Sequence, residues 1–264
     1  MPEKQPLGRK PKTDPRAPFA EPSFYFGERS SQEALVLLVE HLLSKGAALT
    51  GNVVLSESAD LDAVADPTWA SIRRAEVSGV DAIREIAANP TLSVVGVRLS
   101  NVVTYAGGRD VEVRLLPISD HAVGRDRHPI AIWCDGEPFE RYVPVRRTQR
   151  AAAELLQLFT SVVDRLEPDY GAILFAWPLP SPSEIAERPD GFEFQDFFLG
   201  RRYVGDTTIQ LTAQTVGSAC SQSLASGSLY LTSGVFGPVG PESTAHGPTI
   251  ARLIVAASRR QWTS

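Results

Sequence analysis

Residues 148–179 read TQRAAAELLQLFTSVVDRLEPDYGAILFAWPL, and this stretch carries the clearest structural pattern in the chain. Apolar residues recur every three or four positions across 152–166, which predicts an amphipathic helix with Thr148 as its N-cap. Pro168 ends this pattern, because proline lacks the N–H group that a helix interior needs. The short apolar run 170–177 then predicts a buried strand. A helix that leads directly into a strand is therefore the centre of the predicted fold.

The region before this stretch begins with a helix and then becomes rich in strands. Ser30 and Glu33 predict a capping box at the start of a helix that Gly46 ends. Three strand-like runs with alternating apolar residues follow, at 95–99, 111–115 and 130–133. Because their connections are short, we expect them to form an antiparallel meander with one solvated face.

These patterns predict an α+β fold with a mixed, mostly antiparallel sheet or sheets and with helices packed on one face. Residues 1–22 contain six prolines and five Lys or Arg, so we expect a disordered, proline-rich and basic leader. Residues 23–140 and 141–264 then form an N-terminal and a C-terminal α+β lobe, or together one continuous domain.

Composition excludes several classes of protein. The chain has 264 residues, 43% of them hydrophobic, and a net charge of −5 at pH 7, which argues against nucleic acid as the partner. No window approaches the roughly 18 apolar residues of a membrane span, and the N-terminus has no signal-peptide pattern, so we expect a cytoplasmic protein. Cys134 and Cys220 are too few for a disulfide framework or a zinc site, and we interpret both as small buried hydrophobic residues.

Two groups of residues have the chemistry of a catalytic site but not its spacing. His121, Asp126 and His128 are ligand types that suit zinc or iron, yet they match no known ligand spacing, and two arginines in the same loop would repel a cation. Ser218 and Cys220 lie in a small-residue segment that lacks the pattern of a nucleophile elbow. We therefore predict no catalytic residue, no metal site and no cofactor.

A segment without charge follows a segment rich in aromatic residues. No charged residue occurs in 207–241, which we call the uncharged block. This block is either a pair of central strands or a partner surface, because the centres of interfaces are depleted of charge. Aromatic side chains just before it would rim such a surface as anchors, although packing in the core is the first interpretation of these residues. The predicted partner-binding residues are Phe194, Phe197, Phe198, Arg201, Arg202 and Tyr203.

Two short motifs carry a resemblance to a known group of proteins. The sequence Pro168-Asp169-Tyr170-Gly171-Ala172-Ile173, followed by the segment 196–203, resembles bacterial immunity proteins of polymorphic toxin systems. In that group a helix leads to a Pro-Asp-Tyr-Gly strand, and an aromatic-Leu-x-Arg segment follows. The similarity covers 149–204, about a fifth of the chain. It implies a cytoplasmic α+β protein that works by binding and not by catalysis.

The main hypothesis is therefore a non-enzymatic bacterial protein-binding module of immunity or accessory type, with another protein, such as a toxin, as its partner. A second hypothesis is a small-molecule enzyme of hydrolase type that uses His121, His128 or Cys220 in a cleft. A third is a subunit of a homo-oligomeric assembly in which neutral strands pair between copies. The sequence does not identify the partner or the oligomeric state.

Overall fold

A computed structural model describes residues 19–56, 72–105, 109–116, 128–139, 143–175, 179–187, 196–203 and 221–232. Its strands are β1 (Phe19–Tyr25), β2 (Ala48–Ser56), β3 (Ile72–Glu76), β4 (Ser93–Ser100), β5 (Val111–Leu115), β6 (Ile130–Asp135), β7 (Tyr170–Leu174), β8 (Asp196–Leu199), β9 (Ser221–Ser223) and β10 (Leu229–Thr232). Its helices are α1 (Ser31–Ser44), α2 (Val80–Ala87), α3 (Val145–Leu166) and α4 (Pro182–Glu187), with two 3-10 turns, η4 (Glu137–Phe139) and η6 (Arg201–Tyr203).

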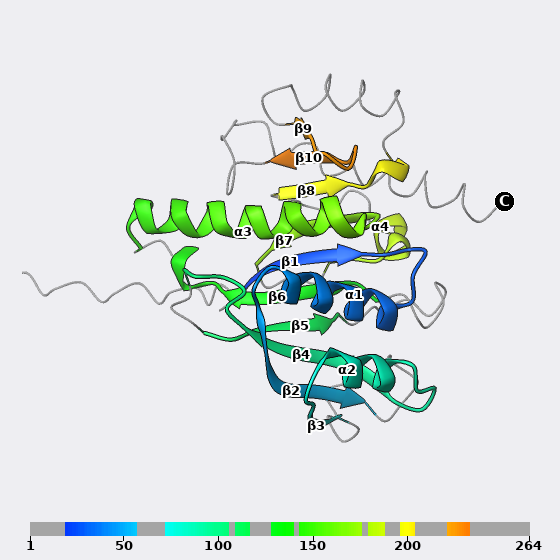
Figure 1. Cartoon of the computed structure of the whole chain (residues 1–264). Helices are drawn as coiled ribbons and strands as arrows, with labels where there is room; N and C mark the ends of the chain where they lie inside the picture. Colours follow the sequence, from blue (N-terminus) through cyan, green and yellow to red (C-terminus); the bar gives the residue numbers. More distant parts are fainter. Residues whose placement is uncertain are drawn as a thin grey trace, which may run out of the picture.

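All described strands belong to one open sheet, in the order β3-β2-β4-β5-β6-β1-β7-β8-β10-β9. Every neighbouring pair is antiparallel, and the meander β4-β5-β6 is present as predicted. Figure 1 shows this sheet along its length, with α3 crossing its upper half. The predicted α+β class, with a mostly antiparallel sheet, is confirmed.

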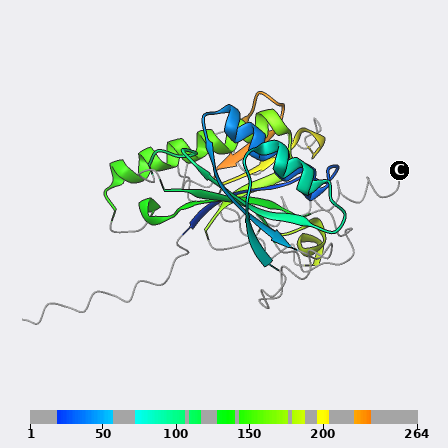
Figure 2. The same ribbon diagram turned by 60° about the horizontal axis from the view of Figure 1, so that its bottom comes forward.

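Helices α1, α2 and α3 cover one face of the sheet (Figure 2), as predicted. The aromatic rings of Phe24 and Phe159 pack together under α3, with centroids 5.3 Å apart. A second apolar cluster lies on the opposite face, where Tyr25 stacks on Tyr170 at 5.0 Å and Ile185 of α4 joins them. Because side chains alternate along a strand, one sheet supplies both clusters.

Strand β1 begins at Phe19, inside the range 1–22 that we expected to be a disordered leader. It lies in the middle of the sheet, paired with β6 on one side and β7 on the other. A proline removes a donor from the ladder, so Pro22 argued against a central strand. Burial of Ala20 and Phe24, both fully inaccessible, provides the compensating apolar contacts.

The helix of the opening stretch begins four residues earlier than predicted, since Pro144 and not Thr148 is the N-cap of α3. The Thr148 hydroxyl instead donates to the carbonyl oxygen of Pro138 at 2.8 Å, which ties α3 to η4. The helix ends where Glu167 adopts a left-handed conformation with φ 50°, ahead of Pro168. Strand β7 follows directly, as predicted.

The Pro-Asp-Tyr-Gly segment has a structural role at the junction of three segments. The carboxylate of Asp169 accepts a hydrogen bond from the Gly27 N–H at 2.6 Å and another from Arg202. A Cβ on Gly171 would collide with the carbonyl oxygen of Ser23 on the neighbouring strand. Glycine is therefore required at 171 because β1 and the ring of Phe198 approach its backbone so closely.

Strands from both predicted lobes join in this sheet. Because β1 pairs with β6 and with β7, the ladder runs without interruption across residue 140 in the described ranges. The larger apolar cluster likewise includes residues from β1 to β10. The division at 140 into two lobes stays a prediction. No helix in the described part of the chain is long and apolar enough to cross a membrane.

Candidate partner-binding groove

Two of the predicted partner-binding residues are core residues. Phe197 and Phe198 have exposed fractions of 1% and 0%, so they form no surface in this structure, and their assignment as exposed anchors needs correction. On β8 the two rings point to opposite faces, and both faces are covered: Phe198 packs on Phe159, and Phe197 stacks on Tyr170. Phe194 lies outside the described residues.

The two predicted arginines differ in what they contact. Arg202 pairs with the buried carboxylate of Asp169 and with Glu28, so it connects η6 to the loop that follows β1. Burial raises the pKa of Asp169, and the charge of Arg202 opposes that rise. Arg201 is exposed, and its aliphatic carbons lie beside Gly227. Arg202 is therefore engaged within the fold, and Arg201 remains accessible to a partner.

A groove with a volume of about 480 Å³ lies between α3 and the hairpin formed by β9 and β10 (221–232). Its helix wall is formed by Ala153, Leu156, Gln157, Thr160 and Asp164. Its hairpin wall is formed by Gln222, Ser223, Leu224, Ala225 and Tyr230. We call this feature the groove. The residues of the helix wall recur three or four apart, so they form one stripe along α3.

The hairpin wall is held in place by its turn. The Leu224 N–H donates to Ser228 O at 2.8 Å, and the Gly227 N–H donates to Leu224 O at 3.0 Å. Gly227 has a φ of 82°, a left-handed conformation that favours glycine. The Ser226 N–H donates to the Asp164 carboxylate of α3 at 3.0 Å, so the two walls meet at this end of the groove.

Tyr230, which lines the groove, packs beside aromatic residues of β8 and α3. Tyr230 pairs across the strands with Phe198, and its ring lies 6.4 Å from that of Phe159 on α3. Its hydroxyl donates to Asp196 at 2.5 Å, which fixes the orientation of the ring. Phe198, one of the predicted partner-binding residues, thus lies buried beside Tyr230.

The groove is almost without charge. Asp164 is the one charged residue among the ten described residues that line it, and five of these ten belong to the uncharged block. The Thr160 hydroxyl donates to the carbonyl oxygen of Leu156. Gln157 and Gln222 are exposed and lie on opposite walls. Residues 204–220 and 233–241 of this region lie outside the described residues.

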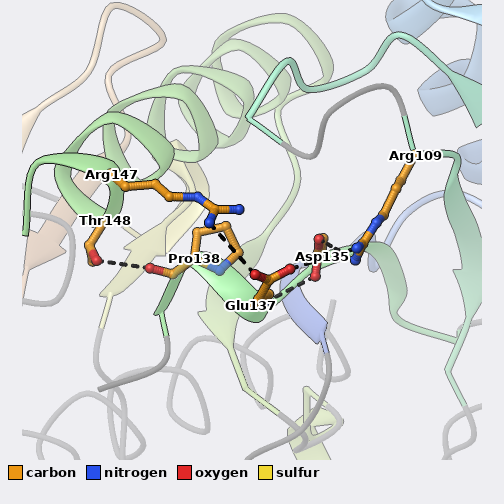
Figure 3. A network of polar contacts seen from close by, with 6 residues as sticks. All are labelled: Arg109, Asp135, Glu137, Pro138, Arg147 and Thr148. Carbon is orange, nitrogen blue, oxygen red and sulfur yellow. Dashed lines mark hydrogen bonds and ion pairs between the residues drawn. The ribbon is translucent and has the colours of Figure 1, made fainter. Parts of the chain in front are cut away.

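A network of ion pairs connects the end of β6 with the start of α3 (Figure 3). Arg109 pairs with Asp135 at 2.7 Å and with Glu137 at 3.7 Å, and Arg147 reaches Glu137 from α3 at 3.6 Å. The side chains of Arg109 and Arg147 are at least half exposed, so solvent screens these ion pairs. We therefore expect these ion pairs to contribute little to the stability of the fold.

The face of the sheet opposite α1–α3 carries a further polar group. The guanidinium of Arg114 lies 4.1 Å from the ring centroid of Trp133, and its Nε is 3.2 Å from Glu112. Burial raises the pKa of Glu21, on the neighbouring strand, to about 7, and the charge of Arg114 opposes this rise. Glu21 is buried on this face, with an exposed fraction of 5%.

The residues considered for catalysis have structural contacts where they are described. The Nδ1 of His128 lies 2.9 Å from the carbonyl oxygen of Leu116, to which it donates, and the ring is buried. Burial raises the pKa of the Cys134 thiol to about 12, so it stays protonated at neutral pH. Cys134 is a buried hydrophobic residue, as predicted. His121 and Cys220 lie outside the described residues.

Comparisons with known proteins do not assign a family. No family model and no curated protein matches the chain. Among solved structures, the chain is similar to one titled "Pseudomonas aeruginosa T6SS protein PA0821", with 11% identity and a TM-score of 0.46, over 90% of this chain and 72% of that one. A likeness of this size carries no argument about function.

Proposed function

We propose that the chain is a non-enzymatic module that binds another protein, and that the groove receives an extended segment of this partner. The supporting observation is the groove itself, about 480 Å³ in volume and lined by nine uncharged residues and Asp164. Pockets of this size accommodate several side chains, and interface centres are depleted of charge. Our assignment to the immunity or accessory type, with a toxin as the partner in the cytoplasm, rests on the sequence resemblance alone.

The chemistry of the walls favours an extended segment as the occupant. The side-chain amides of Gln157 and Gln222 each offer one acceptor and two donor hydrogens, which match the N–H and C=O groups of a peptide bond. Leu156 and Leu224 supply apolar surface for alternate side chains of the segment. Strand β9 is one of the two edge strands of the described sheet, a position at which partner strands commonly add.

The predicted residues around the groove keep a part in this proposal. Arg201 flanks the turn of the hairpin, where it contributes to the polar rim of the interface. Phe194 and Tyr203 stay predicted partner contacts. Arg202 acts indirectly, because it is paired with Asp169 and Glu28.

The test compares two tyrosine substitutions on α3. Ala153 is exposed and lines the groove, whereas Gln149 is exposed one turn away and does not line it. Ala153→Tyr fills the groove with a bulky uncharged side chain at a cost of about 0.5 kcal/mol in helix propensity. Wild type, Ala153→Tyr and the control Gln149→Tyr are each immobilised, and proteins retained from the source bacterium are quantified by mass spectrometry.

We expect at least one protein to be retained equally by wild type and Gln149→Tyr and to be reduced about tenfold or more by Ala153→Tyr. Calorimetric titration of that purified protein into each variant then measures the Kd directly. Retention of every partner by Ala153→Tyr with an unchanged Kd, and with a wild-type circular dichroism spectrum, would exclude the groove as the binding site.

The two alternative functions, a hydrolase-type enzyme and a subunit of a homo-oligomer, gain no support from the described residues. The ring of His128 is used in a backbone contact, and His121 and Cys220 lie outside the described residues, so no described observation favours the hydrolase hypothesis. A second copy of the chain is the occupant required by the homo-oligomer hypothesis. Light scattering on purified wild type and Ala153→Tyr distinguishes this case, because the groove variant would then lower the molecular mass.

A further inference from the structure

We infer that the segment bound in the groove carries a lysine or an arginine, and that this side chain pairs with Asp164. This inference rests on the proposed function and adds the chemical class of the partner. The charge pattern of the groove supports it, because Asp164 is the one charged residue among the ten residues of the described ranges that line it.

The position of Asp164 makes its carboxylate available to a partner. One oxygen accepts the Ser226 N–H at 3.0 Å, which leaves the second oxygen as a free acceptor. The residue is exposed, and it forms no ion pair with any residue in the described ranges. A carboxylate held by a helix and by a turn loses little conformational entropy when it binds a cation.

The end of α3 strengthens the preference for a cation. Asp164 lies in the last turn of the helix, which ends at Leu166, and carbonyl groups concentrate partial negative charge at this end. Arg165 projects from the same turn but does not line the groove. An acidic side chain in the groove would therefore be repelled, and a basic one attracted.

The chain does not supply this cation from the described part of its own hairpin. Arg201 lies closest to the turn, but its Cδ and Cγ contact the position of Gly227, and it is absent from the lining of the groove. None of the described residues that line the groove is basic, and we therefore assign the cation to the occupant.

The test starts from a phage library of random seven-residue peptides, which needs no known partner. Full-length wild-type protein selects the peptides, and peptides that also bind Ala153→Tyr are removed. One enriched peptide is then labelled, and its Kd is measured by fluorescence anisotropy for wild type, Asp164→Asn and Glu85→Gln. Asparagine keeps an acceptor for the Ser226 N–H and removes only the charge. Glu85, exposed on α2, is the matched control for loss of one negative charge.

We expect enriched peptides to share a Lys or Arg at one position. Asp164→Asn should raise the Kd about three- to tenfold, and Glu85→Gln should leave it unchanged. Replacing the basic residue of the peptide by Ala should weaken binding to wild type by the same factor and should not weaken it further in Asp164→Asn.

Other outcomes separate this inference from the proposed function. Groove-dependent peptides without a basic residue, or basic peptides that bind Asp164→Asn as tightly as wild type, would overturn the inference and leave the groove as a binding site. A selection that enriches no peptide sensitive to Ala153→Tyr would overturn both.

Discussion

Glu21 and Asp169 are acidic residues buried on neighbouring parts of the sheet, with exposed fractions of 5% and 1%. Burial is the main cause of a raised pKa in both. Asp169 receives hydrogen bonds from Gly27 and Arg202, whereas the Glu21 carboxylate forms no hydrogen bond with the described part of the chain. Burying a charged carboxylate costs free energy unless a cation, a hydrogen bond or a bound proton offsets that cost. For Asp169 the offset comes from Arg202 and the Gly27 N–H, whereas for Glu21 the raised pKa favours the protonated form.

Glu21→Gln should change how stability depends on pH. Because the pKa of Glu21 rises from 4.5 to about 7 on folding, its favourable contribution is complete below pH 4.5 and is lost as pH rises through 7. Glutamine does not titrate, so the variant should match wild type near pH 4.5 and exceed its unfolding free energy by about 2 to 3 kcal/mol at pH 8.5. Urea unfolding at both pH values measures this, with Glu85→Gln as the exposed control. Equal effects of Glu21→Gln at both pH values would contradict the assignment.

Removal of Arg202 should destabilise the fold. Arg202→Ala leaves the buried carboxylate of Asp169 without its cation, and we expect a loss of about 3 kcal/mol at pH 8. The loss should be smaller at a lower pH, because a larger fraction of Asp169 is then protonated and carries no charge to compensate. Arg201→Ala is the neighbouring control and should cost less than about 0.5 kcal/mol. A loss that is the same at both pH values would show that Arg202 acts by packing alone.

At the scale of elements, α3 combines a strong apolar stripe with unfavourable charges at its start. Its N-cap, Pro144, provides no side-chain hydrogen bond, and its first turn has no acidic residue. Arg146 and Arg147 lie there instead, near the positive end of the helix dipole. Arg147 is compensated by Glu137, whereas Arg146 has no ion pair with a described residue. Packing of the apolar stripe therefore stabilises α3 despite the unfavourable charges at its start.

The same substitution at the two ends of α3 should have opposite effects. Arg146→Glu places a negative charge at the positive end and should raise the unfolding free energy by about 0.3 to 1 kcal/mol. Arg165→Glu places it at the negative end and should lower the free energy by a similar amount. Urea unfolding at low and high salt tests this, since salt should reduce both effects. Changes of the same sign would rule out the dipole as the cause.

At the scale of the whole molecule, one sheet connects the two halves of the chain. Strand β1 pairs with strands from both halves, and the larger apolar cluster includes residues from both. The groove also joins distant segments, because its walls come from α3 and from the hairpin. Separation of the halves would expose the ladder edge of β1 and the ring of Phe24.

We therefore expect one cooperative unfolding transition. Tryptophan fluorescence and far-ultraviolet circular dichroism should give the same urea midpoint, because the sheet and its cores unfold together. Two separate midpoints would instead support independent lobes on either side of residue 140.

Local patterns predicted much of the fold. The helix and strand of 148–179, the capping box at Ser30 and the three-strand meander follow from periodicities within about ten to twenty residues. The Ser30 hydroxyl does accept from the Glu33 N–H at 3.1 Å. Such features depend on neighbours in the sequence, so they can be read without the fold.

The burial of individual side chains and the position of the groove depend on contacts between residues that lie far apart in the sequence. The sequence by itself determined the α+β class, most of the elements and the charge-free nature of the block that lines one wall. Only the tertiary structure decided that β1 begins at Phe19 in the centre of the sheet, that Phe197 and Phe198 are covered on both faces, and that α3 forms the other wall. The physical reason is that the exposure of a side chain is set by whichever segments pack against it, and those segments lie far away along the chain.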